Sequence, residues 1–220
     1  VGMVKIMQNL PSKTYWNWLN KLGINKRLET DLFESTAGQL KSKNIFVTQS
    51  IEPAVASFGK GFSISPLKLA QLHAVLANGG SEIIPHVTLN FKAHLKNYSP
   101  KEIFSNEVSK TVLKWMESVV DNGSGKGAKI DGYRIGGKTG TSQKAVNGRY
   151  TSKKVCSFVA SFPVNNPKYV VLVVIDEPSK AYAYGSTVAV PIAKEIIESL
   201  IVIEKIPPQI EENRKVVKKP

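Results

Sequence analysis

The chain has 220 residues, 42% of them hydrophobic, which is enough to bury the core of one domain or of a large part of one. Its formal charge of +13 favours either an anionic partner or a solvated basic surface. A single cysteine, Cys156, excludes an intrachain disulfide and a cysteine-based metal cluster, and we expect it to be a small core residue. No run approaches the ~20 apolar residues of a membrane span.

Three segments have the apolar spacing of helices. The first starts at Ser12 and is closed by Gly23, where a left-handed residue is expected. The second starts with Ser65 as an N-cap and Pro66 in the first turn, and stops at residues 78–80, Asn-Gly-Gly. The third covers residues 105–121 and ends in a glycine-rich loop.

After that loop the period becomes strand-like. The runs Val155–Phe162 and Tyr169–Asp176 are rich in β-branched and aromatic residues, and a short turn-rich segment separates them. They are typical of an antiparallel hairpin. The second run is apolar almost throughout, so we expect it to be covered on both faces, once by a final helix over residues 186–203.

Helices come first and strands second, without an internal repeat, which indicates an α+β fold around an antiparallel sheet. Pro207 and Pro208 are expected to end ordered structure. We therefore expect residues 207–220 to be a disordered basic tail.

The strongest local signal is Lys138-Thr139-Gly140-Thr141, which lies between a glycine-rich turn and the predicted hairpin. A strand edge with a cation, two hydroxyls and a glycine can bind a carboxylate while its backbone accepts an extended ligand as an added strand. The Lys-Thr-Gly tripeptide is among the signatures of β-lactamases and penicillin-binding proteins.

The same residues also match a P-loop, because residues 132–139 have two glycines separated by four residues and followed by Lys-Thr. A P-loop needs a buried strand before it and a helix starting at its Lys-Thr. Residues 127–131 do not have the pattern of a strand core, and residues 140–148 contain two glycines and no apolar stripe. The context therefore favours the carboxylate-binding interpretation over a nucleotide site.

The flanks of the motif resemble a known family. Residues 136–144, Gly-Gly-Lys-Thr-Gly-Thr-Ser-Gln-Lys, are similar to the third active-site motif of class B penicillin-binding proteins, the monofunctional peptidoglycan transpeptidases. Residues 59–80 resemble that family's glycine turn and following helix, residues 157–178 its two last strands, and residues 188–192 its last helix. The resemblance extends to about Ile206 and is closest to the FtsI-like septal branch. It implies that the antiparallel sheet is packed between helices and accompanied by a helical subdomain, and that residues 1–206 are the C-terminal portion of a transpeptidase domain.

The resemblance implies acylation by a stem peptide ending in D-Ala-D-Ala, followed by transfer to an amine, with β-lactam antibiotics as competing ligands and no metal or organic cofactor. Lys138 is expected to attract the terminal carboxylate and to support a relay serine, and Thr139 and Thr141 to hydrogen-bond that carboxylate. The backbone N–H of Thr141 is expected to be one oxyanion-hole donor, a kind whose loss typically costs ~3 kcal/mol. Gly140 is expected to keep the strand edge open for the ligand.

The family's nucleophile motif Ser-x-x-Lys and its relay motif Ser-x-Asn do not occur at the expected places. Residues 1–3 resemble those that follow Ser-x-Asn, so both motifs are expected upstream, and the chain alone is expected to be inactive and to fold poorly with an exposed sheet edge. The resemblance also implies a bacterial inner membrane location with the domain on the extracytoplasmic side, an anchor outside this chain, and other cell-division or wall-synthesis proteins as partners.

Formal matches to the missing motifs occur inside the chain. Residues 57–60 and 65–68 read Ser-x-x-Lys, and residues 42–44 read Ser-x-Asn. With 20 serines and 26 lysines in the chain, about two Ser-x-x-Lys matches are expected by chance, so none of these serines is our candidate nucleophile.

Two other functions stay open from sequence alone. One is a nucleotide-binding or basic nucleic-acid-binding module, although the resemblance predicts no nucleic-acid partner; the other is a β-lactamase, which shares Lys-Thr-Gly. The three histidines, His73, His86 and His94, lack metal-ligand spacing, and we interpret the helix-borne His73 as structural.

Overall fold

The computed structural model describes residues 1–33, 35–89, 91, 99–146, 149–180 and 182–209. The chain divides into two compact units, which we call the helical unit and the sheet unit. The helical unit contains residues 1–75 and 81–103, and the sheet unit contains residues 76–80 and those from 104 onward. His94 and residues 210–220 of the predicted tail lie outside the described residues.

The helical unit is built from short helices around a small apolar core. In chain order they are α1 (Gly2–Gln8), α2 (Ser12–Lys21), α3 (Lys43–Thr48), α4 (Ile51–Ala56) and most of α5 (Pro66–Ala77). The core buries Leu19, Ile24, Phe46 and Ala56, with Tyr15 and Trp16 packed against it. Our sequence analysis missed α1, α3 and α4, because six or seven residues are too few to display a helical period.

The predicted helix ends are confirmed by their capping geometry. Gly23 follows α2 with φ +69°, and Gly79 follows α5 with φ +87°, the left-handed region that glycine tolerates. The Ser65 hydroxyl accepts a hydrogen bond from the N–H of Lys68 at 3.2 Å. Ser105 caps α6 (Asn106–Asn122) in the same way through the N–H of Val108 at 3.2 Å.

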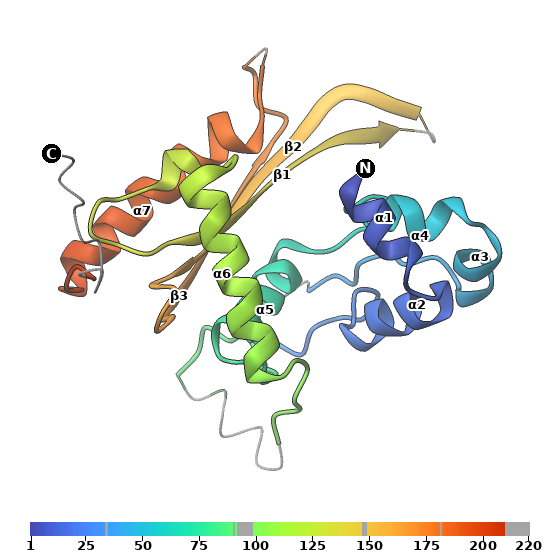
Figure 1. Ribbon diagram of the computed structural model, residues 1–220, viewed down its shortest axis with the longest axis horizontal. Coiled ribbons are helices and arrows are strands. Elements are labelled where there is room, and N and C mark those ends of the chain that lie inside the picture. The colour runs from blue at the N-terminus through green and yellow to red at the C-terminus, as the bar shows by residue number, and fades with distance from the viewer. Residues whose placement is uncertain (34, 90, 92–98, 147–148, 181, 210–220) are drawn as a thin grey trace, which may run out of the picture. The chain divides into compact units, whose positions relative to one another are not determined.

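The sheet unit contains a three-stranded antiparallel sheet in the order β1-β2-β3 (Figure 1). Its strands are β1 (Gly136–Val146), β2 (Arg149–Phe162) and β3 (Tyr169–Asp176). The predicted β2–β3 hairpin is confirmed, since residues 155–162 pair one to one with residues 169–176. The sequence analysis missed the second half of β1 and the first six residues of β2, because polar residues and glycines replace β-branched ones there.

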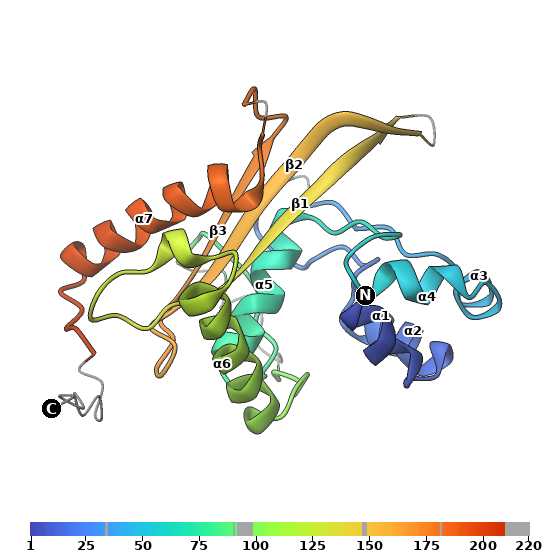
Figure 2. The same ribbon diagram turned by 45° about the horizontal axis from the view of Figure 1, so that its top comes forward.

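Helices cover the sheet and position β1. The last helix, α7 (Val190–Ile203), follows a π-helical turn over Gly185–Ala189 and buries Val190, Ala193 and Ile197 against the sheet. Figure 2 shows the sheet between α7 and α6. The core between α7 and the sheet is completed by five strand residues, Phe158, Ala160, Phe162, Val171 and Val173. α6 packs on the start of β1, where a Cβ atom at Gly136 would lie 3.3 Å from the Cβ of Met116.

One expectation about the last strand is wrong. β3 is not covered on both faces by the described residues, because Val171 and Val173 are buried while Val174 on the other face is 36% exposed. The described residues reach one position past Pro208, and the tail predicted beyond them stays a prediction. The N–H of Gln209 donates to Gly132 O at 2.6 Å, so the chain folds back onto the loop before β1.

Candidate ligand-binding edge

The four motif residues, Lys138 to Thr141, lie within the first half of β1. β1 pairs only with β2 among the described strands, so its other edge has no strand partner there. The Lys138 side chain is exposed, and its Nζ donates a hydrogen bond to the carbonyl of Thr139 at 2.7 Å. The motif therefore presents a cation beside an open strand edge, as the sequence predicted.

The two threonine hydroxyls of the motif have partners from segments far away in the sequence. The hydroxyl of Thr139 shares a hydrogen bond with that of Ser124 at 2.6 Å, and Ser124 belongs to the loop after α6. The hydroxyl of Thr141 accepts the N–H of Gly185 at 3.0 Å. Because residues i and i+2 of a strand share a face, the two hydroxyls point to the same side of the sheet.

Sequence reasoning missed Ser124 and Gly185 as parts of this site. Ser124 was visible only as one residue of a glycine-rich loop, and Gly185 had no local signal. A Cβ atom at Gly185 would lie 2.6 Å from Gly140 O and would also press on the carbonyl of Ser157. Gly185 is therefore required so that the turn before α7 can approach the motif backbone this closely.

The structure suggests a reason for glycine at position 140 that differs from the predicted one, which was an open edge for the ligand. A Cβ atom there would lie 2.5 Å from Oγ of Ser157, its register partner on β2. A side chain at this position would require the Ser157 hydroxyl to rotate away, so the sheet itself favours glycine here independently of any ligand. A buried neighbour also restricts the residue type at position 137, since a Cβ atom at Gly137 would overlap the ring of Phe158.

The P-loop alternative is excluded by the backbone. Lys138 and Thr139 lie in the middle of a strand, and the described residues before it, 130–135, form a turn and extended loop rather than a buried strand. A P-loop requires a helix that starts at its Lys-Thr and directs its N–H groups at the phosphates. No phosphate cradle of this kind can form at residues 132–139.

The comparisons with known proteins agree with this geometry. The family profile described as the penicillin binding protein transpeptidase domain matches residues 1–198. The chain belongs to the penicillin-binding transpeptidase family. It is 46% identical to a peptidoglycan D,D-transpeptidase FtsI homolog of Mesostigma viride and 34% identical to a probable peptidoglycan D,D-transpeptidase PenA of Neisseria flavescens. These alignments cover 96% and 94% of the chain but 39% and 51% of the relatives.

Solved structures of penicillin-binding transpeptidases show the same fold. The transpeptidase domain of Burkholderia pseudomallei penicillin-binding protein 3 superposes with a TM-score of 0.83 at 29% identity. The superposition covers 95% of this chain and 62% of that domain. The predicted α+β fold with an antiparallel sheet and helices is thereby confirmed.

The serines of the formal Ser-x-x-Lys matches have structural roles. The hydroxyl of Ser57 donates to Ala54 O at 2.7 Å, and that of Ser65 caps α5. Lys68 is buried, its pKa is lowered by desolvation, and its Nζ donates to Gln71 Oε1 at 2.8 Å. Ser42, of the formal Ser-x-Asn match, is the N-cap of α3. None of these contacts resembles a nucleophile activated by a lysine.

The remaining sequence candidates are structural among the described residues. Cys156 is fully buried, and burial raises the pKa of its thiol, as expected of a core cysteine. Nδ1 of His86 lies 3.0 Å from Ile84 O, and its ring stacks on Phe91. Within the described ranges, no group of three His, Cys, Asp or Glu side chains could hold a metal ion, and no helix has the length and apolarity to cross a membrane.

Proposed function

We propose that this chain supplies the carboxylate-binding edge of a peptidoglycan D,D-transpeptidase, an acyltransferase that cross-links stem peptides during wall synthesis, with a septal role. The observation that carries the proposal is the placement of Lys138, Thr139 and Thr141 on the open edge strand of a transpeptidase fold. The chain spans less than two thirds of the length of the relatives it matches. The catalytic cycle is therefore proposed for the protein as its organism makes it, which we call the host-length protein.

The edge suits the carboxyl terminus of an extended peptide ending in D-Ala-D-Ala, or a β-lactam. The Lys138 ammonium supplies charge, and the Thr139 and Thr141 hydroxyls lie on one face, so they can turn from Ser124 and Gly185 toward a carboxylate. The backbone of β1 accepts the ligand as an added strand. The N–H of Thr141 is proposed as one oxyanion-hole donor. In this proposal the reaction needs no metal or organic cofactor.

The nucleophilic serine is proposed to lie outside these 220 residues. The catalytic domain is proposed to lie on the extracytoplasmic side of the bacterial inner membrane, where peptidoglycan is assembled, with its membrane anchor outside this chain. Residues 1–206 would then be one portion of the catalytic domain and residues 207–220 a basic tail. The partners proposed are the stem peptide, β-lactams and other proteins of division or wall synthesis, and no nucleic acid.

Labelling with a fluorescent penicillin tests the proposal. The host-length protein should form a covalent adduct, an excess of D-Ala-D-Ala peptide should slow its formation, and Lys138→Met should nearly abolish it. The matched control is Lys110→Met, which removes another exposed lysine, on α6, and should leave labelling unchanged.

The 220-residue chain on its own should form no adduct. An adduct mapped by peptide mass spectrometry to Ser57 or Ser65 would overturn the assignment of the nucleophile. Absence of labelling in the host-length protein would overturn the transpeptidase function itself.

A further inference from the structure

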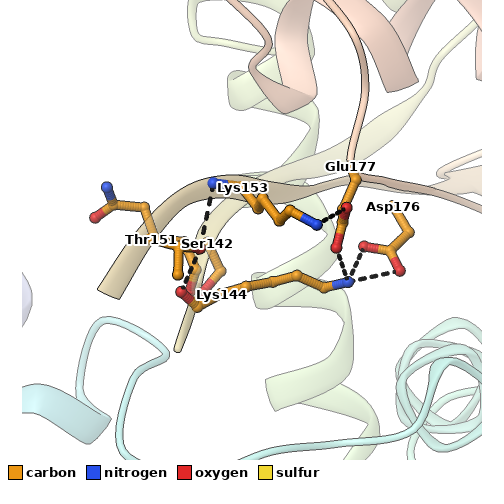
Figure 3. Close-up of polar contacts among 7 residues, drawn as sticks. Ser142, Lys144, Thr151, Lys153, Asp176 and Glu177 are labelled. Carbon is orange, nitrogen blue, oxygen red and sulfur yellow. Dashed lines mark hydrogen bonds and ion pairs between the residues drawn. The ribbon is translucent and has the colours of Figure 1, made fainter. Parts of the chain in front are cut away.

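Four charged side chains form a cluster at the far end of β1 (Figure 3). We call this cluster the clamp, and its members are Lys144, Lys153, Asp176 and Glu177. Nζ of Lys144 lies 2.8 Å from Oδ1 of Asp176 and 2.8 Å from Oε1 of Glu177. Nζ of Lys153 lies 2.8 Å from the other carboxylate oxygen, Oε2, of Glu177. Two cations and two carboxylates thus form one neutral network that spans all three strands.

An irregularity in the strand pairing creates the position of Lys144. Pairing is one to one from Gly136 to Gln143, and it resumes at Ala145 after two extra residues of β2. One residue of β1, Lys144, therefore lies opposite three residues of β2, Thr151 to Lys153. The Thr151 hydroxyl donates to Lys144 O at 3.0 Å and accepts the N–H of Lys153 at 3.3 Å, which closes the bulge.

The carboxylate end of the clamp is also fixed by its backbone. The N–H of Glu177 donates to Lys154 O at 2.9 Å, so Glu177 extends the β2–β3 pairing past the end of β3. Glu177 has φ +50°, a conformation that residues with side chains rarely adopt. This unusual backbone directs its carboxylate at both lysines. The hydrogen bonds that Lys144 donates to Asp176 and then to Glu177 raise the pKa of its ammonium group, as expected of a cation held by two carboxylates.

The clamp lies next to the ligand-binding edge. Asp176 pairs with Val155, which pairs with Ser142, the residue immediately after Thr141. Lys144 thus reaches across β2 to a carboxylate level with the end of the motif. β1 has a strand partner on one side only among the described residues, so this link supplies lateral support that a second neighbouring strand would otherwise give.

We propose that Lys144 is a positioning residue, which through Asp176 and Glu177 holds the Lys138–Thr141 edge in the geometry that receives the ligand. The inference rests on the proposed function. Added-strand binding needs the edge backbone at the correct distance and twist, and a displacement of about 1 Å at a reacting centre can cost up to ~100-fold in rate. Lys144 itself touches no ligand in this proposal.

The test compares Lys144→Met and Asp176→Asn with wild type in the host-length protein. The rate of labelling at saturating fluorescent penicillin should fall about tenfold in Lys144→Met and less in Asp176→Asn. Lys144→Arg keeps the charge and should recover most of the rate. The matched control is Lys194→Met, which breaks the solvent-exposed Lys194–Glu198 pair of α7 and should label at the wild-type rate.

Hydrogen exchange supplies a readout that needs no ligand. The amides of residues 140–146 should exchange faster in Lys144→Met, while those of α7 keep their wild-type protection. Labelling of Lys144→Met at the wild-type rate would overturn the positioning role. So would an equal loss in Lys194→Met, or slow labelling without any change of exchange in β1.

The two proposals fail in distinguishable ways. If the wild-type protein is not labelled, the proposed transpeptidase function is wrong. The role of the clamp is then tested by amide hydrogen exchange alone. Faster exchange confined to β1 would support a clamp that holds this strand, and unchanged exchange would overturn it.

Discussion

The two ends of β1 are held by different forces. At its start, Gly136 and Gly137 are buried, and the neighbouring atoms belong to Met116 and Phe158. At its end, the strand is mostly exposed and is held by Lys144 through ion pairs with β3. Apolar packing involves no charges that salt can screen or pH can titrate, whereas exposed ion pairs respond to both. The Lys138–Thr141 motif therefore lies between an end of β1 fixed by apolar packing and an end held by ion pairs.

The largest expected effect comes from the packed end. Phe158 has no exposed surface and lies under Gly137, so Phe158→Ala should lower the free energy of unfolding by about 4 kcal/mol. Urea denaturation followed by circular dichroism measures this loss. Phe58 is 54% exposed, and Phe58→Ala should stay within about 0.5 kcal/mol of wild type. Similar losses for both would contradict the assignment of Phe158 to the core.

A smaller loss is expected when the same contact is overfilled. Gly137→Ala adds a Cβ atom that overlaps the Phe158 ring, and this should cost about 2 kcal/mol. Gly2→Ala is the control, because no atom lies within 4 Å of a Cβ atom there. In the Phe158→Leu background the penalty of Gly137→Ala should shrink. An unchanged penalty would show that the two sites do not interact.

Within the motif, stability and ligand binding can be separated at Gly140. Gly140→Ala should cost about 1 kcal/mol, since its Cβ atom would lie 2.5 Å from the Ser157 hydroxyl oxygen. Adding Ser157→Ala should restore the unfolding midpoint. Penicillin labelling should remain slow in the double variant if the ligand also needs the open edge. Recovery of both the unfolding midpoint and the labelling rate would show that Gly140 is needed only for packing within the sheet.

The smallest effect concerns the charged end and depends on pH. The hydrogen bond from Lys144, and then that from Lys153, lowers the pKa of Glu177 from 4.5 to about 2. A carboxylate with a depressed pKa stabilises the fold above its ordinary pKa, and this contribution is lost as the pH falls from about 4.5 to 2. Glu177→Gln should therefore lower the unfolding midpoint at pH 6 but not at pH 2, as measured by thermal melts.

Glu198→Gln removes an exposed carboxylate from α7 and is the matched control for the pH series. It should change the melting temperature little at any pH, because exposed pairs of this kind contribute little. A difference between Glu177→Gln and wild type that persists undiminished at pH 2 would show that the effect is not electrostatic.

Elements with a strong local period or cap were predictable from the sequence. Ser65, Ser105 and Gly23 marked helix ends that the structure confirms, because capping depends on residues only three or four positions apart. The β2–β3 hairpin was predictable because both strands are runs of β-branched and aromatic residues separated by a short turn. The polar half of β1 was not, because its extended conformation comes from pairing with β2 and the sequence there favours no structure locally.

The candidate site divides in the same way. Four consecutive residues, Lys138 to Thr141, and their ordered flanks were enough to indicate the family and to point to a candidate ligand-binding strand. The contacts of Ser124, Gly185 and Asp176 with that strand join positions separated by 15 to 44 residues along the chain. Only the tertiary structure decided them, because local sequence patterns report periodicity and capping, whereas these contacts depend on how β1 is packed and paired.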